Sequence, residues 1–406
     1  MTFQCDTINR FLTFARILDP RSKLGTFDRL DSYYEKPSFE YQHILRFMDL
    51  LEDNYDGYLE HLFLNSANII KRDTSLCYFD CTNYYFEIEQ EDDEYVDEVT
   101  GEILNGLRRY GLSKQHQPSP LVQTGLFMDG NGIPISMCIN PGSDNEQKCA
   151  LPLEKKILKM FQEKPFIYCA DAGLGSYDIR KFNSMGGRAF IVAQSVKKLS
   201  DTLQKAVFND YDYRRLSNNS LTTVNEMKSF DRFQQDNLPL YDDSVYKVLT
   251  ADKAVDTGLI DNEEKYDGYY AIATNLNDDV KTILEINSQR YKIEDCFRVL
   301  KTNFNSRPIH HRNRNRIIAH FMICYTALLI YRLLENKLNQ YGTHFTTDNI
   351  LDTLKNMNVM NTQDAFYTAA YIRSQVCTSL NGVFDLGLDK KYYLPKELNK
   401  KIKKIL

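Results

Sequence analysis

The chain has 406 residues, of which 43% are hydrophobic and 26% charged, and these fractions are those of a globular protein with one or more large cores. Its formal net charge of −5 excludes a strong overall positive field, so any contact with nucleic acid must use local basic patches. The nine cysteines are scattered and include no CxxC pair, which argues against a zinc site and indicates a reducing compartment.

Residues 1–72 are predicted to be helical, because apolar side chains recur there at spacings of three and four residues. No recognisable DNA-binding module precedes these helices, so we expect a truncated N-terminal region. The most apolar stretch, Phe321 to Leu334, is too short to span a bilayer and contains Arg332. It predicts a buried helix. With no signal peptide at the N-terminus, we expect a cytoplasmic protein.

The apolar run Leu76–Phe79 predicts a buried strand that ends on Asp80, with a partner strand beginning near Tyr84 across a turn. A carboxylate at the end of a buried strand must be paired, hydrogen-bonded or bound to a metal. Asp80 is therefore either a turn-capping residue or part of a site. The acidic run at 89–99 predicts a solvated loop.

Residues 121–129 and 133–140 predict a β-hairpin, since Gly130-Asn131-Gly132 joins two apolar segments. A helix follows, for which Ser143 or Asp144 is the expected N-cap. These elements predict that the middle of the chain is an α/β unit.

A second apolar run, residues 166–170, ends on Asp171 and is followed by Gly173 and Gly175. A helix and a further strand at 189–195 come next, so Asp171 lies at the C-terminal end of a strand, where open α/β sheets place their sites. The glycines would let the backbone approach a ligand closely, although an ordinary strand-to-helix turn has the same composition.

Residues 196–265 are polar and rich in Asn and Asp, which predicts an inserted unit that is mostly β or irregular. A strand at Tyr269–Thr274 returns the chain to the sheet, and Asn277 to Asp279 can cap the next helix.

The segment Asn287 to Lys301 is predicted to form one helix, on which Arg290, Glu294 and Lys301 fall within an arc of roughly 40°. A solvated salt-bridge face would give this pattern. A catalytic carboxylate between cations that bind an anion would give it too. After Lys301 the densest basic cluster of the chain follows, and it fits either a charged loop or a phosphate-backbone contact. Its members are Arg307, His310, His311, Arg312, Arg314 and Arg316.

Three carboxylates therefore stand out: Asp80, Asp171 and Glu294. If the two strands are neighbours, the three acids could converge on two Mg²⁺ ions, which prefer oxygen ligands. Two such ions activate water or a 3′ hydroxyl for in-line attack. Arg290 and Lys301 would then hold phosphates beside the metals.

These residues resemble the DDE transposases of bacterial insertion sequences that carry the Y-x2-R-x3-E-x6-K signature. The resemblance covers about residues 70–335 and includes YFDCTNYYFE, CADAGLGS and the segment from Arg290 to Lys301. The signature tyrosine is replaced by Asn287, and the nearby Tyr291 is not on the same face.

The resemblance implies an α/β fold with an RNase H-like mixed sheet flanked by helices, a β-rich insertion, and helical N- and C-terminal parts. It implies that Asp80, Asp171 and Glu294 bind two Mg²⁺ or Mn²⁺ ions. Arg290 and Lys301 would contact phosphates at the transposon ends, and Arg307, His311 and Arg312 would add DNA contacts. The expected partners are terminal inverted repeats, target DNA and a second copy of the chain, close to the nucleoid and with no membrane.

The expected division of the chain is a helical region at 1–72, a catalytic core at 73–195 and 266–337, an insertion at 196–265 and a helical region at 338–406. Two other functions stay open. One is a non-catalytic DNA-binding remnant that represses an intact transposase. The other is a structure-selective nuclease on the same fold.

Overall fold

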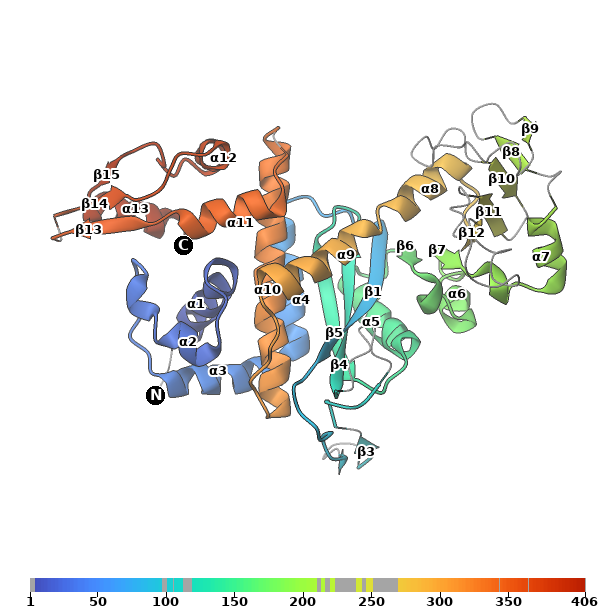
Figure 1. Ribbon diagram of the computed structural model, residues 1–406, viewed down its shortest axis with the longest axis horizontal. Helices are drawn as coiled ribbons and strands as arrows, with labels where there is room; N and C mark the ends of the chain where they lie inside the picture. The colour runs from blue at the N-terminus through green and yellow to red at the C-terminus, as the bar shows by residue number, and fades with distance from the viewer. Residues whose placement is uncertain are drawn as a thin grey trace, which may run out of the picture.

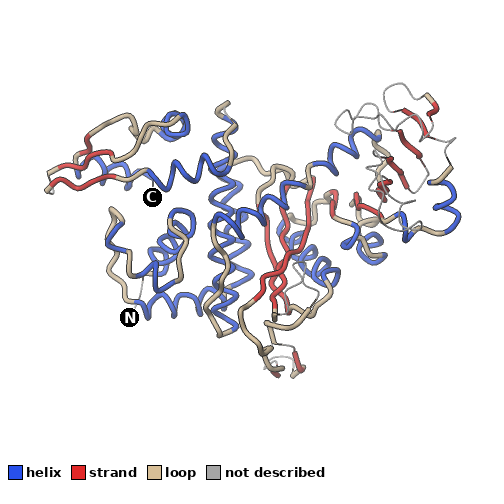
Figure 2. The backbone as a smooth tube through the Cα atoms, in the orientation of Figure 1, coloured by secondary structure: helices blue, strands red, loops and turns tan. Residues whose placement is uncertain are grey.

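The computed structural model describes residues 4–96, 101–104, 106–111, 119–209, 213–215, 220–222, 239–242, 246–250, 269–342, 344–363 and 365–405. Its long central helix is α10 (Arg314–Gln340). Figure 1 shows α1 (Cys5–Leu18), α2 (Lys23–Phe27) and α3 (Tyr41–Asp53) on one side of α10 and the main sheet on the other. Figure 2 shows the strands of the main sheet on the side of α10 away from the N-terminus, whereas the strands of the C-terminal region lie on the same side as the N-terminus.

The main sheet is mixed. Within the described residues its strand order is β5-β4-β1-β6-β7-β12-β11-β10-β8-β9. The central strands are β1 (Leu76–Tyr85), β4 (Leu121–Asp129), β5 (Pro134–Pro141), β6 (Ile167–Ala170), β7 (Ala189–Gln194) and β12 (Tyr269–Thr274). β5, β4 and β1 pair antiparallel, whereas β6 and β7 continue parallel to β1. The predicted RNase H-like mixed sheet flanked by helices is confirmed.

The predicted hairpin is confirmed as β4 and β5, joined through a turn in which Gly132 has φ +83°, a conformation that favours glycine. The following helix is α5 (Glu146–Met160), and its N-cap is Asn145, whose side chain accepts a hydrogen bond from Gln147 N. The expected cap at Ser143 or Asp144 is wrong, because the Asp144 N–H instead bonds to Pro141 O in the turn that ends β5.

Helices cover both faces of the sheet, because alternate residues of β1 point to opposite sides. Phe79 packs with apolar residues of α5, such as Ile157, on one face. Tyr78 points to the other face, where its hydroxyl donates to Ile286 O at 2.9 Å. That second face is covered by α8 (Val280–Ser288), α9 (Tyr291–Arg298) and α10.

The N-terminal region consists of helices that pack around α10. They are α1 (Cys5–Leu18), α2 (Lys23–Phe27), α3 (Tyr41–Asp53) and α4 (Tyr55–Ile69). α10 is long and apolar enough to cross a membrane, but 89% of its most apolar window is buried inside the protein. The prediction of a buried helix over Phe321 to Leu334 therefore agrees with its position in the core.

The C-terminal region has the predicted helices and, in addition, a small sheet that was not predicted. It contains helices α11 (Thr347–Asn356), α12 (Gln375–Phe384) and α13 (Pro395–Ile405), together with the three-stranded sheet β13 (Val359–Thr362), β14 (Phe366–Ala369) and β15 (Tyr392–Tyr393). Aromatic pairs between strands, such as Phe366 with Tyr392, stabilise this small sheet. Contacts between residues so far apart in the chain leave no short-range pattern.

The remaining described elements are short. They are α6 (Tyr177–Phe182), α7 (Asp201–Val207), β2 (Tyr95–Val96), β3 (Ile103–Leu104), β8 (Tyr213–Arg215), β9 (Leu221–Thr222), β10 (Pro239–Asp242) and β11 (Tyr246–Thr250). Much of the predicted insertion at 196–265 lies outside the described residues.

Candidate active site

Asp80 and Asp171 lie side by side on neighbouring parallel strands. The last paired residues of β1 and β6 are Phe79 and Ala170, so the two aspartates follow at the same level. Each carboxylate accepts a hydrogen bond from the next backbone N–H, at 2.7 Å from Cys81 N and 2.7 Å from Ala172 N. By strand alternation both lie on the sheet face that α9 covers.

Asp171 follows the last residue of β6, as predicted, and caps a short 3-10 helix at Ala172–Leu174. Asp80 does not end its strand, so that prediction is wrong. β1 continues to Tyr85, because β4 supplies backbone partners throughout, from Cys81 opposite Gly125 to Tyr85 opposite Leu121. The expected turn before Tyr84 is absent from this described strand.

The segment predicted as one helix, Asn287 to Lys301, is divided in the structure. α8 ends at Ser288, α9 begins at Tyr291, and a π-helical turn occupies Val299–Asn303. The wider π turn changes the direction of Lys301 from that of an ideal α-helix, and such turns are frequent at functional sites.

Arg290 joins two of the three predicted carboxylates. Its Nη2 atom lies 3.5 Å from Asp171 Oδ1 and 4.0 Å from Glu294 Oε1. The side chains of Asp171 and Glu294 are 57% and 65% exposed, whereas Arg290 is largely buried. The guanidinium therefore partly compensates two carboxylates that both face solvent.

Lys301 reaches the same sheet face two residues beyond Asp80. Its Nζ atom donates to Thr82 Oγ1 at 2.5 Å and lies 5.1 Å from the centre of the Tyr84 ring. Asp80, Thr82 and Tyr84 are every second residue of β1, so their side chains lie on one face of the sheet. Lys301 thus places a positive charge on the strand that carries the first acid.

The three carboxylates have the hard oxygen donors that Mg²⁺ and Mn²⁺ prefer, so the donor set suits such ions. Their placement suits them only in part. Asp80 and Asp171 are adjacent, but Arg290 separates Asp171 from Glu294, and the described residues hold no group of three ligands close enough for one metal. The three-carboxylate metal site therefore stays a prediction.

The members of the basic cluster after Lys301 lie in two different places. Arg314 and Arg316 pair with Glu52 and Asp49, at 3.1 Å and 3.0 Å, and so anchor α10 to α3. Arg307 lies elsewhere, with its guanidinium 5.0 Å from the centre of the Tyr85 ring at the end of β1.

Arg307, His311 and Arg312 line a cavity of about 370 Å³ beside that strand end. The structure thus brings these three predicted DNA contacts together, about 17 Å along β1 from Asp80 if each strand residue spans about 3.3 Å.

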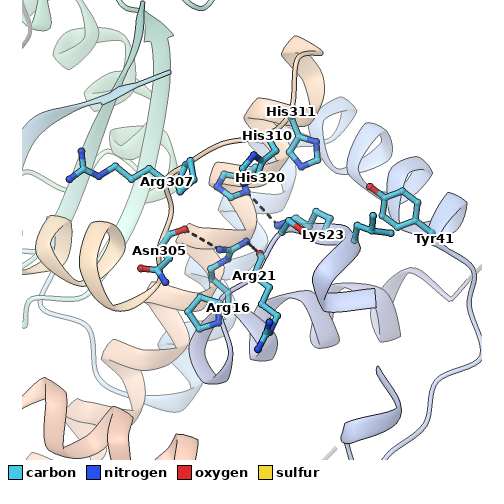
Figure 3. A pocket seen from close by; sticks show the side chains of 13 residues that line it. Arg16, Arg21, Lys23, Tyr41, Asn305, Arg307, His310, His311 and His320 are labelled. Atoms are coloured by element: carbon cyan, nitrogen blue, oxygen red, sulfur yellow. Dashed lines mark hydrogen bonds between the residues drawn. The ribbon is translucent and has the colours of Figure 1, made fainter. Parts of the chain in front are cut away.

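Sequence reasoning missed Arg16 and Lys23, which come from the N-terminal helices and face the residues that follow Lys301 (Figure 3). One signal was present: Arg16 is a charged residue on the apolar face of α1, beside Leu12 and Ala15.

A family model described as "Transposase DDE domain" matches residues 110–330, more than half of the chain. The chain belongs to the transposase DDE domain family. The matched part of this DDE-domain protein contains Asp171, Arg290, Glu294 and Lys301, whereas Asp80 lies before it. The prediction of a DDE transposase is therefore confirmed at the level of this family, whose members act in DNA transposition, whereas the insertion-sequence type and its signature stay predictions.

Solved structures with low similarity to this DDE-domain protein are also transposases. A piggyBac transposase synaptic complex is 11% identical over 87% of this chain and 71% of the other, with a TM-score of 0.46. A Drosophila P element transposase complex is 11% identical over 100% and 86%, with a TM-score of 0.27. A Mos1 transposase paired-end complex is 10% identical over 47% and 58%, with a TM-score of 0.19. No curated protein matches.

Proposed function

We propose that this protein is a metal-dependent DNA transposase of the insertion-sequence type, which cuts DNA at transposon ends and joins the freed 3′ hydroxyl to target DNA. The observation that carries the proposal is the adjacent pair of Asp80 and Asp171, with Arg290 linking Asp171 to Glu294. Family membership supplies the chemical class, and the arrangement of these side chains supports a strand-cutting member.

In this proposal Asp80, Asp171 and Glu294 hold two Mg²⁺ or Mn²⁺ ions through their carboxylate oxygens. Ions bound there would activate the attacking water or 3′ hydroxyl and stabilise the leaving oxygen. The carboxylates of Asp171 and Glu294 are open to solvent, so DNA can approach them. A bound metal ion would also compensate the negative charge of Asp171 and Glu294, so these carboxylates would no longer depend on Arg290 for a positive partner.

Arg290 and Lys301 hold phosphates of the cut strand in this proposal. Both cations lie at the sheet face that carries the aspartates, one against Asp171 and the other on Thr82. Phosphate contacts of this kind set the position of the strand and carry no sequence information. Arg307, His311 and Arg312 continue the contact beyond the end of β1, and a homodimer in the cytoplasm, near the nucleoid, acts on two ends together.

The test is cleavage of a DNA duplex that carries the terminal repeats flanking the gene, with Mg²⁺, with Mn²⁺ and with chelator. Wild type is expected to cut only with metal. Asp171→Ala should lose more than the roughly 10- to 100-fold typical of an outer-shell partner. Asp178→Ala, an exposed acid on α6, is the matched control and should cut normally. Full cutting by Asp171→Ala would refute the assignment.

A second candidate is a non-catalytic DNA-binding remnant that represses an intact transposase. Two observations favour it: no three-ligand metal group occurs in the part of the chain that is described, and Asn287 replaces the signature tyrosine. Among the described residues, the buried side-chain oxygen of Asn287 has no hydrogen-bond partner. Metal-independent binding of the repeats, with no cutting in Mg²⁺ or Mn²⁺, would support this candidate.

A further inference from the structure

A basic cavity of about 720 Å³ lies between the N-terminal helices and the segment that follows Lys301. Figure 3 shows side chains from both parts facing one another across it. Its positively charged or titratable lining includes Arg16, Arg21, Lys23, Arg307, His310 and His311. Among the described lining residues there is no Asp or Glu. The cavity therefore gathers basic groups without acidic ones.

Lys23 is the most telling of these residues, because its side chain is nearly inaccessible, with 3% exposed. Its Nζ atom lies 3.5 Å from His320 Nδ1. The other ring nitrogen, His320 Nε2, lies 3.0 Å from Ser306 O, a group that can only accept, so Nε2 carries the hydrogen and Nδ1 accepts from Lys23. Within the described residues no carboxylate forms an ion pair with Lys23.

Arg16 is a second buried cation, with 5% exposed. Its guanidinium donates to the carbonyl oxygens of Phe304 and Asn305, both at 3.2 Å, and to Arg21 O at 3.0 Å. These bonds tie α1 to the segment after Lys301. They leave the charge without a carboxylate in the described part of the chain, and the Nε atom without an acceptor.

Burying two uncompensated cations side by side is costly, since each loses hydration and they repel each other. Burial, with a further contribution from Arg16, lowers the pKa of Lys23 to about 7. An anion in the cavity would remove this cost, because attraction is stronger in a region of low dielectric. Three donors on Lys23 suit the oxygens of a phosphate group.

The cavity connects to the candidate active site through Lys301 and Arg307. Lys301 bonds to Thr82, and Arg307 lies against Tyr85 at the end of the same strand. The 370 Å³ cavity beside Tyr85 shares Arg307, Pro308, His310 and His311 with this one. Basic groups thus line the way from the end of β1 to Lys23. Among the described residues that line the two cavities, Glu87 is the one acid.

We propose that the cavity around Lys23 is a phosphate-binding site that takes a backbone phosphate of the DNA strand bound at the candidate active site. The choice of DNA as the source of the phosphate rests on the proposed function. The site makes the N-terminal helices part of the DNA-binding surface. The N-terminal helices contact the DNA strand at a distance from the carboxylates, and Arg290 and Lys301 contact the same strand beside the carboxylates.

The experiment measures binding of a terminal-repeat duplex by fluorescence anisotropy over a range of salt concentrations, with chelator present so that no cutting occurs. Lys23→Met should weaken binding about tenfold, as expected for loss of a charged hydrogen bond, and reduce the salt slope by about one phosphate contact. Lys36→Met, an exposed lysine outside the cavity, should leave both unchanged. Thermal melting checks the fold.

A surface pair keeps the test decisive if Lys23→Met does not fold. Arg21 and Arg29 are both exposed and both pair with Asp19, at 2.7 Å and 3.3 Å, but only Arg21 lines the cavity. Arg21→Met should weaken binding about threefold more than Arg29→Met. Equal affinities and equal salt slopes within each pair of variants would overturn the proposal.

Inorganic phosphate identifies the source of the ligand. If phosphate raises the melting temperature of wild type but not of Lys23→Met, and both proteins bind DNA equally, the cavity takes a free anion and the DNA assignment is overturned. The outcome is also separate from that of the proposed function. Weaker DNA binding by Lys23→Met in a protein that never cuts would support this site and refute the transposase chemistry.

Discussion

The Nη2 atom of Arg290 lies 3.5 Å from the Oδ1 atom of Asp171, and the same nitrogen lies 4.0 Å from Glu294. A cation therefore stands where two of the predicted metal ligands would need to approach each other. Because these carboxylates are more than half exposed, solvent screens the pairs and each is worth little. Arg290 can exchange its carboxylate partners for a phosphate at low cost.

Arg290→Met is expected to strengthen Mn²⁺ binding to the free protein by about threefold, because a competing positive charge is lost from a solvent-screened site. The same change should weaken DNA cleavage, since the proposed phosphate contact goes with it. Calorimetric titration with Mn²⁺ measures the first effect. Arg298→Met is the control, because Arg298 also belongs to α9 but pairs with Asp295. Weaker Mn²⁺ binding by Arg290→Met would contradict this account.

A buried ion network holds α9, and with it Glu294, against α10. Arg332 bonds to Asp295 at 2.5 Å and to Glu335 at 2.6 Å, with only 9% of its side chain exposed. Arg332→Met should lower the free energy of unfolding by about 3 kcal/mol, because two acids lose a buried partner. Urea titration measures it. Arg298→Met removes the exposed partner of Asp295 and should cost less than about 1 kcal/mol.

DNA binding is expected to depend on pH through Lys23. The groups whose charges act on this side chain are Arg16, His311, His320 and Cys324. Burial lowers the pKa of His311 to about 4 and holds the pKa of His320 well below its usual value, so neither histidine gains charge above pH 6.

Since the pKa of Lys23 is about 7, its charge is present at pH 6 and lost above pH 7. Affinity should therefore fall by up to about tenfold in total as pH rises above 7 in wild type, the loss expected when the Lys23 charge is removed. Lys23→Met should lack that part of the pH dependence. Anisotropy titrations at pH 6, 7 and 8 compare the two proteins, and parallel curves would count against a charged Lys23 as the phosphate donor.

Glu154 on α5 should make the protein less stable as pH rises. Its side chain is 0% exposed, and both carboxylate oxygens lack a hydrogen-bond partner among the described residues. Burial raises the pKa of Glu154 to about 8 from the usual 4.5.

Between those two values the native protein binds a proton that the unfolded chain has released, so stability falls with rising pH by about 1.4 kcal/mol per unit. Glu154→Gln should remove this slope and be more stable than wild type at pH 8. Denaturant unfolding at pH 5, 6.5 and 8 measures the difference. An unchanged slope in the variant would place the titration on another group.

The local sequence pattern was sufficient for the hairpin of β4 and β5, for β6, and for Asp171 at a strand end. Turn residues and apolar runs act over a few neighbouring residues, so one stretch of sequence contains the information. The same reasoning erred at Asp80, because the length of β1 depends on the hydrogen bonds that β4 offers, and β4 begins 36 residues after β1 ends. The strand propensity of the residues in β1 contains no information about these hydrogen bonds.

The sequence by itself determined the types of residue that the chemistry needs: acids after apolar runs, and cations near Glu294. Only the tertiary structure decided which of them meet. It placed Arg290 between Asp171 and Glu294, and it brought Arg16 within hydrogen-bond distance of Asn305, 289 residues along the chain. Such meetings follow from how α1, α2 and α10 pack, which depends on the whole apolar core rather than on any short pattern.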